Sequence, residues 1–350
     1  MRDIKPARIG QPISTMDPPL REKKNDWLRV RLEIAFWLAA VAIIFIMPRR
    51  LLLLNEIAIL ALFALSLDMI LGYAGVVSLG HAAFLGLGAY TAGLAAKAYA
   101  LDPLLCVAAA AGTSGLLGLA TSFLVLRGSD LTRLMVTLAV ALLLGEGANK
   151  AAWLTGGADG LQGMTMGPIG GMFEFDLAGR TAYVLSLTTL FVLFVIARRI
   201  MASPFGMTLR TIRDNPLRAA AIGVPVTRRL VTIYTIAAIY AGVAGGLLAV
   251  TTQFVSLDVF DFSRSADVML VLILGGTGYL YGGIIGAVVF KVLADVLSGL
   301  TPQYWRFWIG LLLVTLMVIG RDRIAGWVGW PARRLLGGGA ATPLAARPAV

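Results

Sequence analysis

Residues 229–250 read RLVTIYTIAAIYAGVAGGLLAV, and this stretch decides the fold class. Arg229, its first residue, carries its only charge. A hydrocarbon core roughly 30 Å thick is crossed by about 20 mostly apolar residues in one α-helix. Residues 229–250 therefore predict a transmembrane helix.

Comparable apolar runs recur along the chain and predict an all-α, polytopic membrane helix bundle. Of the 350 residues, 58% are hydrophobic and 14% are charged, and the mean hydropathy is +0.84, which excludes an ordinary soluble domain. Segment 266–278 is short for a full crossing, so a re-entrant segment there would reduce ten helices to nine or eight. The ten predicted spans lie near residues 34–48, 51–71, 77–98, 103–126, 132–150, 180–198, 229–250, 266–278, 281–300 and 304–320.

The basic residues set the predicted orientation of these spans. The net charge is +11, and the Lys and Arg residues cluster in the polar stretches between apolar runs, which is the pattern of cytoplasmic loops rather than of nucleic-acid binding. Ten spans place Arg127, Arg133 and residues 198–229 in the cytoplasm, whereas Arg49 and Arg50 disagree. The glycine-rich segment 153–179 is assigned to the periplasmic face.

The spans divide the chain into one transmembrane domain and two tails. Residues 1–31 lack an apolar core followed by a small-residue cleavage site, so we expect a cytoplasmic tail rather than a removable signal peptide. Residues 32–320 form the transmembrane domain, which includes a cytoplasmic loop at 199–228. Residues 321–350 form the second cytoplasmic tail. Both tails lack apolar periodicity and are expected to be disordered.

Three features of the sequence argue against an enzyme or a metal site. Cys106 is the only cysteine and His81 the only histidine, so an intramolecular disulfide and a Cys/His metal site are not expected. His81 also has no evident nucleophile and acid around it, which disfavours a membrane-embedded hydrolase. No GxxxxGK[ST] motif occurs, so the chain lacks the loop that binds ATP phosphates. We expect no cofactor, and an energy source in a partner.

The cytoplasmic loop contains the signals of a short helix. Residues 202–225 read ASPFGMTLRTIRDNPLRAAAIGVP. Asn215 can cap a helix, and Pro216 suits its first position. Gly223 is a natural left-handed stop, and Pro225 prevents continuation. The sequence predicts a sharply bounded helix of one or two turns.

A helix this short is marginal in water, so we expect it to pack against another molecule. Its face would offer Leu217, Ala220 and Ala221 for burial, while Arg213 and Arg218 would pair with acidic groups. The alternative is an interfacial loop whose arginines contact anionic lipid headgroups.

Three segments together resemble the membrane permeases of branched-chain amino-acid ABC importers, of the LivM type. LGYAGVVSLGHAAFLGLGAYTAG, residues 71–93, resembles the glycine-rich early motif of that family. DNPLRAAAIGV, residues 214–224, resembles its cytoplasmic coupling loop, and ILGGTGYLYGGIIGAVVF, residues 273–290, its late glycine-rich segment. The resemblance extends over residues 51–320. Gly283 stands where the late motif of the family commonly has proline.

The resemblance implies a bacterial inner-membrane transporter made of several subunits. These are two different permease chains, two cytoplasmic ATP-binding subunits and a periplasmic amino-acid-binding protein, in contact with membrane lipid and with no nucleic acid. This chain would be a non-catalytic permease that alternates between outward and inward openings. Its short helix would seat in a groove of an ATPase through Asp214, Asn215, Pro216, Leu217, Arg218, Ala220 and Gly223.

The early motif supplies the predicted substrate pathway. Non-helical backbone survives at membrane depth only where it lines protein or a water-filled cavity. A zwitterionic substrate needs polar partners there, so we nominate Gly75, Ser78, Gly80 and His81 as pathway residues. For His81 we favour a structural hydrogen bond to a neighbouring helix over a proton relay.

Several other polar residues fall within the predicted spans. Most lie near span ends, where interfacial placement is expected, and Asp68 and Glu146 are the first two to test. The full set is Glu56, Asp68, Glu146, Asn149, Asp267, Lys291 and Asp295.

Two other transporter classes remain as alternatives. A sugar or nucleoside ABC permease would share the glycine-rich bundle, and only the motif resemblance separates it from an amino-acid permease. An ion-coupled secondary transporter should keep paired acids near the bilayer midplane, and the sequence shows no clear pair of this kind.

Overall fold

Every regular element that the structure describes is helical. The computed structural model describes residues 21–99, 101–171, 173–176, 178–304, 307–311 and 314–315. In these ranges the only β pairings are isolated bridges, Leu161 with Val255 and Ile169 with Phe173, so the predicted all-α class is confirmed. The elements are α1 (Arg21–Ile46), η1 (Pro48–Arg50), α2 (Leu51–Leu71), α3 (Ala82–Tyr99), α4 (Pro103–Val125), α5 (Asp130–Lys150), α6 (Ala152–Thr155), η2 (Gly157–Asp159), α7 (Arg180–Ala202), α8 (Pro204–Asp214), α9 (Pro216–Ala221), α10 (Val226–Thr252), η3 (Leu257–Phe260), α11 (Phe262–Gly275) and α12 (Leu280–Leu300).

Within the described residues, 6 helices are long and apolar enough to cross a membrane. The chain is therefore a multi-pass membrane protein, while the predicted count of ten is not confirmed. α11 has 14 residues, so it is about 21 Å long at a rise of 1.5 Å per residue, which agrees with the expectation that it does not cross alone. The 6 candidate spans are Pro48–Leu71, Pro103–Val125, Asp130–Lys150, Arg180–Ala202, Val226–Thr252 and Leu280–Leu300.

Two predicted boundaries differ from the observed ones. The span predicted at 77–98 becomes helical only at Ala82, because residues 72–81 leave the α-helical path and Gly75 adopts a positive φ of 71°. At the N-terminal end, α1 already begins at Arg21, so residues 21–31 of the expected tail are helical. Residues 1–20, residues 321–350 and most of the span predicted at 304–320 lie outside the described residues.

The chain forms two compact units with a boundary at Leu51. In the first unit, α1 carries an apolar segment, Glu33–Ile46, that is shorter than the candidate spans. The second unit contains α3 to α12 and nearly all of α2.

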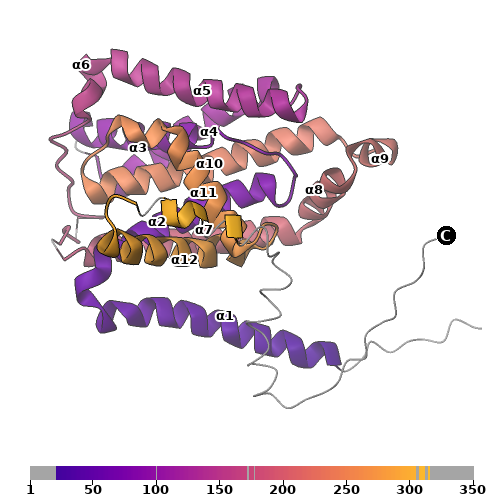
Figure 1. The fold of residues 1–350 in the computed structure, drawn as a ribbon, viewed down its shortest axis with the longest axis horizontal. Coiled ribbons are helices and arrows are strands. Elements are labelled where there is room, and N and C mark those ends of the chain that lie inside the picture. Colours follow the sequence, from indigo (N-terminus) through magenta and orange to yellow (C-terminus); the bar gives the residue numbers. More distant parts are fainter. Residues whose placement is uncertain are drawn as a thin grey trace, which may run out of the picture. The chain divides into compact units, whose positions relative to one another are not determined.

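The core of the second unit forms around α10, which packs against α3 and α4 (Figure 1). Glycine makes this close packing possible, because a Cβ at Gly88 would collide with the backbone of Gly242. A Cβ at Gly242 would in turn collide with Ser114 of α4, and one at Gly246 would meet Ala110. The small-residue spacing of Gly242 and Gly246 therefore serves helix packing.

A second tight contact closes the hairpin of α11 and α12. A Cβ on Gly282 would collide with the carbonyl oxygen of Gly276, and one on Gly286 with that of Val271. The late glycine-rich segment thus brings α11 and α12 into backbone contact. Gly283, which replaces the usual proline, lies inside α12 and faces the backbone of α2 at Ala64.

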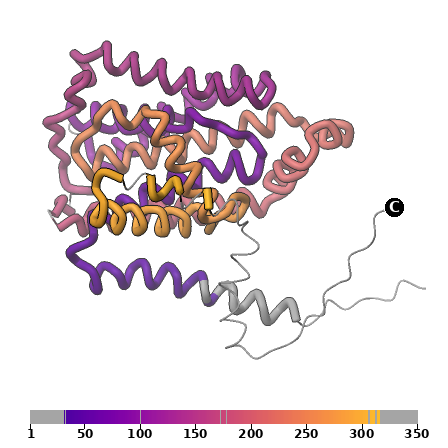
Figure 2. The backbone as a smooth tube through the Cα atoms, in the orientation of Figure 1, coloured from indigo at the N-terminus to yellow at the C-terminus, as the bar shows by residue number. Residues whose placement is uncertain are grey.

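The outer helices of the second unit expose apolar side chains. Only 11% of the apolar window of α5 is buried, against 78% for α10. Figures 1 and 2 show α5 running along one edge of this unit. Large exposed apolar surfaces on several helices are expected of a bundle surrounded by lipid.

Candidate functional site

The predicted short helix is present as α9, Pro216–Ala221, and its ends are those that the sequence indicates. The Asn215 side chain accepts a hydrogen bond from the backbone N–H of Arg218 at 3.0 Å, which caps the helix. Pro216 occupies the first turn. Gly223 adopts a positive φ of 88°, where a residue with a Cβ would be strained, and α10 begins directly after Pro225.

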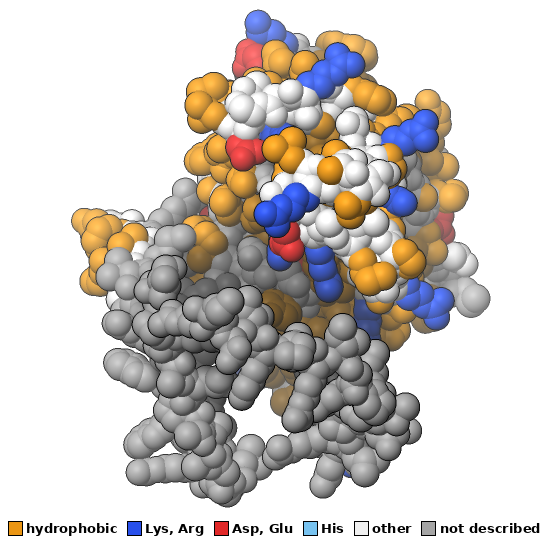
Figure 3. All heavy atoms as spheres, turned by 90° about the vertical axis from the view of Figure 1, so that its right-hand side faces the viewer, with side chains coloured by type: hydrophobic (Ala, Val, Ile, Leu, Met, Phe, Trp, Pro, Cys, Tyr) orange, Lys and Arg blue, Asp and Glu red, His pale blue; other side chains and the backbone are white. Residues whose placement is uncertain are grey.

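α9 presents apolar side chains to its surroundings. Leu217 is 82% exposed and Ile222 is 73% exposed, and Ala220 is exposed as well. Only Ala219 turns inward and is fully buried. Figures 1 and 2 place α9 at the far end of α8 and α10, and Figure 3 shows this end with Lys and Arg side chains scattered around apolar ones. Such a combination suits a protein partner with an apolar groove and an acidic rim.

α8 fixes α9 to the bundle. Its inner face buries Leu209 and Ile212 almost completely. Gly206 lies so close to the backbone of Met201 that a Cβ would collide with it. α8 therefore packs closely against the end of α7. A force on α9 is passed to α8, which is itself packed in the bundle.

Arg213, which was expected to pair with acidic groups, lies beside Asp214 and also contacts the bundle. Its Nη1 donates a hydrogen bond to the carbonyl oxygen of Gly72, after the end of α2. Its Nε lies 3.6 Å from a carboxylate oxygen of Asp214. A Cβ built on Gly75 would come 2.8 Å from Cγ of Arg213, so glycine at 75 makes room for this arginine.

The early motif, the coupling loop and the late motif meet at Arg213. Asp68, near the end of α2, accepts a hydrogen bond of 2.7 Å from the backbone N–H of Gly278 in the turn between α11 and α12. A Cβ on Gly278 would lie 3.3 Å from Nη1 of Arg213. Asp68 is fully buried, so its predicted interfacial placement is wrong. The carboxylate serves instead to join the ends of two helices.

The irregular segment 72–81 is enclosed by other helices. His81 is fully buried, and its Nε2 lies 2.8 Å from the hydroxyl of Ser66 on α2, which confirms the structural hydrogen bond predicted for it. Ser78 is 1% exposed, and its hydroxyl has no hydrogen-bond partner among the described residues. A Cβ at Gly80 would collide with the backbone carbonyl of Thr137 on α5. The position of Gly80 is explained by packing.

None of the four nominated pathway residues lines the polar opening beside α2. That opening, the mixed-charge cavity, has a volume of about 520 Å³ and lies among α2, α10, η3, α11 and α12. It is lined by Glu56, Ile59, Leu60, Phe63, Leu85, Leu248, Thr252, Phe254, Ser256, Asp258, Val259, Asp261, Ser263, Arg264, Asp267, Phe290, Lys291 and Ala294.

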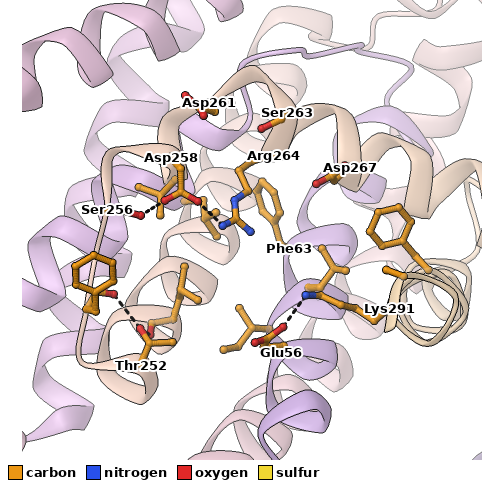
Figure 4. A pocket seen from close by; sticks show the side chains of 18 residues that line it. Glu56, Phe63, Thr252, Ser256, Asp258, Asp261, Ser263, Arg264, Asp267 and Lys291 are labelled. Carbon is orange, nitrogen blue, oxygen red and sulfur yellow. Dashed lines mark hydrogen bonds and ion pairs between the residues drawn. The ribbon is translucent and has the colours of Figure 1, made fainter. Parts of the chain in front are cut away.

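Two ion pairs face the mixed-charge cavity. Lys291 Nζ on α12 lies 2.6 Å from a carboxylate oxygen of Glu56 on α2. Arg264 Nη2 on α11 lies 2.6 Å from a carboxylate oxygen of Asp258, which also accepts a hydrogen bond from Ser256. Figure 4 shows Arg264 and Lys291 reaching from different helices toward the same open space. The charged side chains are partly exposed, so each of them is available to a ligand.

The wall behind these charges is apolar. Phe63 is almost fully buried, and its ring stacks on His81 with the ring centroids 5.4 Å apart. Ile59, Leu85 and Phe290 extend this surface. A site with charges of both signs and an apolar wall can bind a molecule that carries an ammonium, a carboxylate and an aliphatic chain.

A second opening, the arginine cavity, lies at the α8–α9 end and has a volume of about 550 Å³. Its lining, as far as the structure describes the chain, includes three arginines and three tyrosines and no acidic residue. Arg210 lies over the ring of Tyr73, 5.1 Å from its centroid. The lining residues are Tyr73, Phe194, Arg198, Arg210, Arg213, Thr277, Gly278, Tyr279, Leu280 and Tyr281.

Sequence reasoning had marked Glu56, Lys291 and Asp267 as polar residues within spans without assigning them to one site. Glu56 and Lys291 are 235 positions apart, and no local pattern brings them together. Glu146, one of the two chosen for testing, instead lies 3.9 Å from Lys150 near the end of α5, and its interfacial placement stays a prediction.

The fold and its exposed apolar helices define an all-helical, multi-pass membrane protein, with no strand among the described residues. The chain belongs to the family described as the permease component of the branched-chain amino acid transport system, whose profile matches residues 50–317.

The similar proteins agree with this family. The LivM permease protein of the high-affinity branched-chain amino acid transport system of Salmonella typhimurium is 27% identical over 279 residues, which cover 73% of this chain and 65% of that protein. LivM of Escherichia coli K12 is 27% identical over 285 residues, with the same coverage. The fructose import permease protein FrcC of Rhizobium meliloti is 31% identical over 122 residues, or 33% of this chain and 34% of that protein.

The chain thus matches 65% of the length of the LivM proteins. No solved structure matches it.

Proposed function

We propose that this chain is a non-catalytic permease subunit of an ATP-driven importer that carries branched-chain amino acids across a bacterial inner membrane. Membership of the family over residues 50–317 is the observation that carries the proposal. The partners it implies are a second permease chain, two cytoplasmic ATP-binding subunits and a periplasmic amino-acid-binding protein.

The mixed-charge cavity supports an amino acid as the substrate. The pair of Lys291 and Glu56 can open to a zwitterion, so that Lys291 holds the carboxylate and Glu56 holds the ammonium, while Arg264 stays paired with Asp258. Because each charge of the substrate then meets an opposite charge of the cavity, the hydration that the substrate loses is offset by charge-assisted contacts. The apolar wall around Phe63 suits a branched aliphatic side chain.

The α8–α9 end supports coupling to an ATPase. In this proposal α9 seats Leu217 and Ile222 in an apolar groove, and Arg218 meets acids at its rim. Asp214 ends α8, Asn215 and Pro216 form the start of α9, Gly223 follows its end, and Ala220 lies on the surface that would be covered. The docked face is then cytoplasmic, as the seven arginines between Arg198 and Arg229 also indicate.

Arg213 links the two regions. A movement of α8 acts through Arg213 on the end of α2 at Gly72 and on the α11–α12 turn at Gly278. α2 carries Glu56, α11 carries Arg264 and α12 carries Lys291. Closure of the ATPases would therefore move the helices that hold both ion pairs, which is a physical route from nucleotide binding to the substrate cavity.

A sugar permease is the second candidate, because FrcC resembles one third of the chain. A sugar is neutral and offers no charged group to either ion pair of the cavity. The charges of the cavity thus favour the amino acid.

Uptake of labelled leucine and labelled fructose, with and without the gene for this chain, tests the proposed function. We expect loss of leucine uptake alone, and we expect uptake to stop when ATP is depleted but to continue when the proton gradient is collapsed. Loss of fructose uptake would indicate the sugar permease. Dependence on the proton gradient would indicate an ion-coupled transporter.

A further inference from the structure

The arginine cavity holds a concentration of positive charge that the transport of a zwitterion does not explain. Arg198 of α7 and Arg210 and Arg213 of α8 all line it. Asp214, which lies 3.6 Å from Arg213, is not part of the lining and has a side chain that is 71% exposed. Among the described residues, three guanidinium groups and no carboxylate line this cavity.

Tyrosines complete a polar lining suited to an oxyanion. Tyr73 lies beneath Arg210, and Tyr281 packs against Phe194 with ring centroids 4.6 Å apart. Tyr279 is 75% exposed at the lining of the same cavity. Guanidinium and phenol groups donate hydrogen bonds, and the paired N–H groups of arginine match the oxygens of a phosphate.

An apolar stripe leads away from the cavity along α12. Tyr281 lies in the cavity wall, and Ile285, Val288 and Val292 follow it at helical spacings of four, seven and eleven residues. All three aliphatic side chains are exposed. Residues at these spacings lie on one face of a helix, so the arginine cavity stands at the end of an apolar track.

The geometry points to an anionic phospholipid as the ligand of the arginine cavity. The phosphate of the headgroup would bind Arg198 and Arg210, and the acyl chains would lie along the α12 stripe. A basic pocket between transmembrane helices is a recognised way to hold such a headgroup. Because Arg213 also contacts Gly72 and approaches Gly278, the bound lipid would brace the junction between α8, α2 and the α11–α12 turn.

Retention of phosphatidylglycerol by the purified full-length chain tests this proposal. The chain is placed in phosphatidylcholine nanodiscs that contain a small fraction of labelled phosphatidylglycerol, and bound lipid is counted by native mass spectrometry. We expect Arg198→Gln and Arg210→Gln each to weaken retention by about tenfold, as the loss of one charge-assisted contact predicts. Arg228→Gln is the matched control, since Arg228 is exposed near the same end and does not line the cavity.

A second kind of variant tests the same proposal without removing an arginine, so that it remains informative if the arginine variants misfold. Thr277 is an exposed residue of the cavity lining, so Thr277→Glu adds a negative charge there and keeps every arginine. We expect it to release phosphatidylglycerol, while Thr227→Glu on the exposed first turn of α10 leaves the lipid bound.

Three outcomes would overturn the proposal. Equal lipid retention by all variants would show that the cavity does not bind phosphatidylglycerol. Displacement of the lipid by an equal concentration of inorganic phosphate or glycerol phosphate would identify a soluble anion as the ligand. If the cavity variants kept the lipid but no longer copurified with the ATP-binding subunits, the arginines would contact an acidic protein segment instead.

Discussion

The two cavities of the second unit differ in how their charges are matched. The mixed-charge cavity contains two ion pairs, each between residues of different elements, whereas the described lining of the arginine cavity has three arginines and no acid. Two paired side chains can each bind the opposite charge of a zwitterion and can re-form their own ion pair when the zwitterion leaves. Three arginines with no acid in the described lining favour an anion that stays bound. The first arrangement suits passage, and the second suits a structural ligand.

The largest expected effect of a single change is on the Lys291–Glu56 pair. Lys291→Met should lower leucine uptake roughly 10- to 100-fold, since one charge-assisted contact to the substrate carboxylate is lost. Both partners are partly exposed, so the cost to stability should be only about 1 kcal/mol or less. Uptake in cells and thermal unfolding of the purified chain measure the two effects separately.

The exchanged pair, Glu56→Lys with Lys291→Glu, shows whether the pair serves transport or only packing. The ion pair can re-form in this variant, but the two charges meet the substrate in reversed order. We expect normal folding and poor uptake. Restored uptake would mean that the pair only joins α2 to α12. Glu146→Gln is the control, because its partner Lys150 lies on the exposed end of α5 and neither lines the cavity.

The α8–α9 end should respond to Ala220→Glu with a loss of coupling. An unpaired carboxylate in an interface is not desolvated without strong compensation, so copurification of the ATP-binding subunits and leucine uptake should fall together, by about tenfold or more. Thr227→Glu adds the same charge on the first turn of α10 and should change neither. Copurification that survives Ala220→Glu would favour the lipid-facing loop over the docking helix.

Substitutions within residues 72–81 should have smaller effects. They should distinguish a residue that is needed for helix packing from one that lines the substrate pathway. Gly80→Ala should lower the free energy of unfolding by about 1–3 kcal/mol, because its Cβ would press on the backbone of Thr137. Ser78→Ala should leave stability nearly unchanged, because the hydroxyl has no partner to lose among the described residues. Chemical denaturation measures both variants. If Ser78→Ala impairs uptake while folding is normal, Ser78 belongs to the pathway as nominated.

The least disruptive test concerns the orientation of the chain in the membrane, which decides the face at which each cavity lies. Cysteines at Ser129 and Asn215 should be shielded from impermeant reagents in intact cells, and a cysteine at Asp159 should react. Cys106 is fully buried, so it should contribute little background labelling. Labelling of Asn215 from outside would invert the orientation and remove the basis for ATPase docking.

The sequence predicted features that depend on neighbours along the chain and missed those that depend on distant segments. α9 was predicted closely because the Asn215 cap, Pro216 and Gly223 act within one or two turns. Apolar length likewise located the helices that match the 6 candidate spans.

The inward turn of Arg213 and the burial of Asp68 had no local signal. Arg213 finds its partner at Gly72, 141 positions away, and Asp68 finds Gly278, 210 positions away. The mixed-charge cavity depends in the same way on Glu56 and Lys291, whose charges looked like separate interfacial residues until the fold joined them. The glycine residues gave only an indirect signal. A high density of glycine in a helix indicates that another helix packs closely against it, but does not indicate which helix.

Binding of labelled leucine to the purified chain in nanodiscs, without the binding protein, tests the central claim that the mixed-charge cavity accepts a zwitterion. Unlabelled leucine should displace the label, whereas leucinamide, which lacks the carboxylate, and 4-methylpentanoate, which lacks the ammonium, should compete at least about tenfold more weakly. Lys291→Met should remove the preference for leucine over leucinamide. Equal competition by 4-methylpentanoate or by fructose, or an unchanged preference in Lys291→Met, would contradict the account.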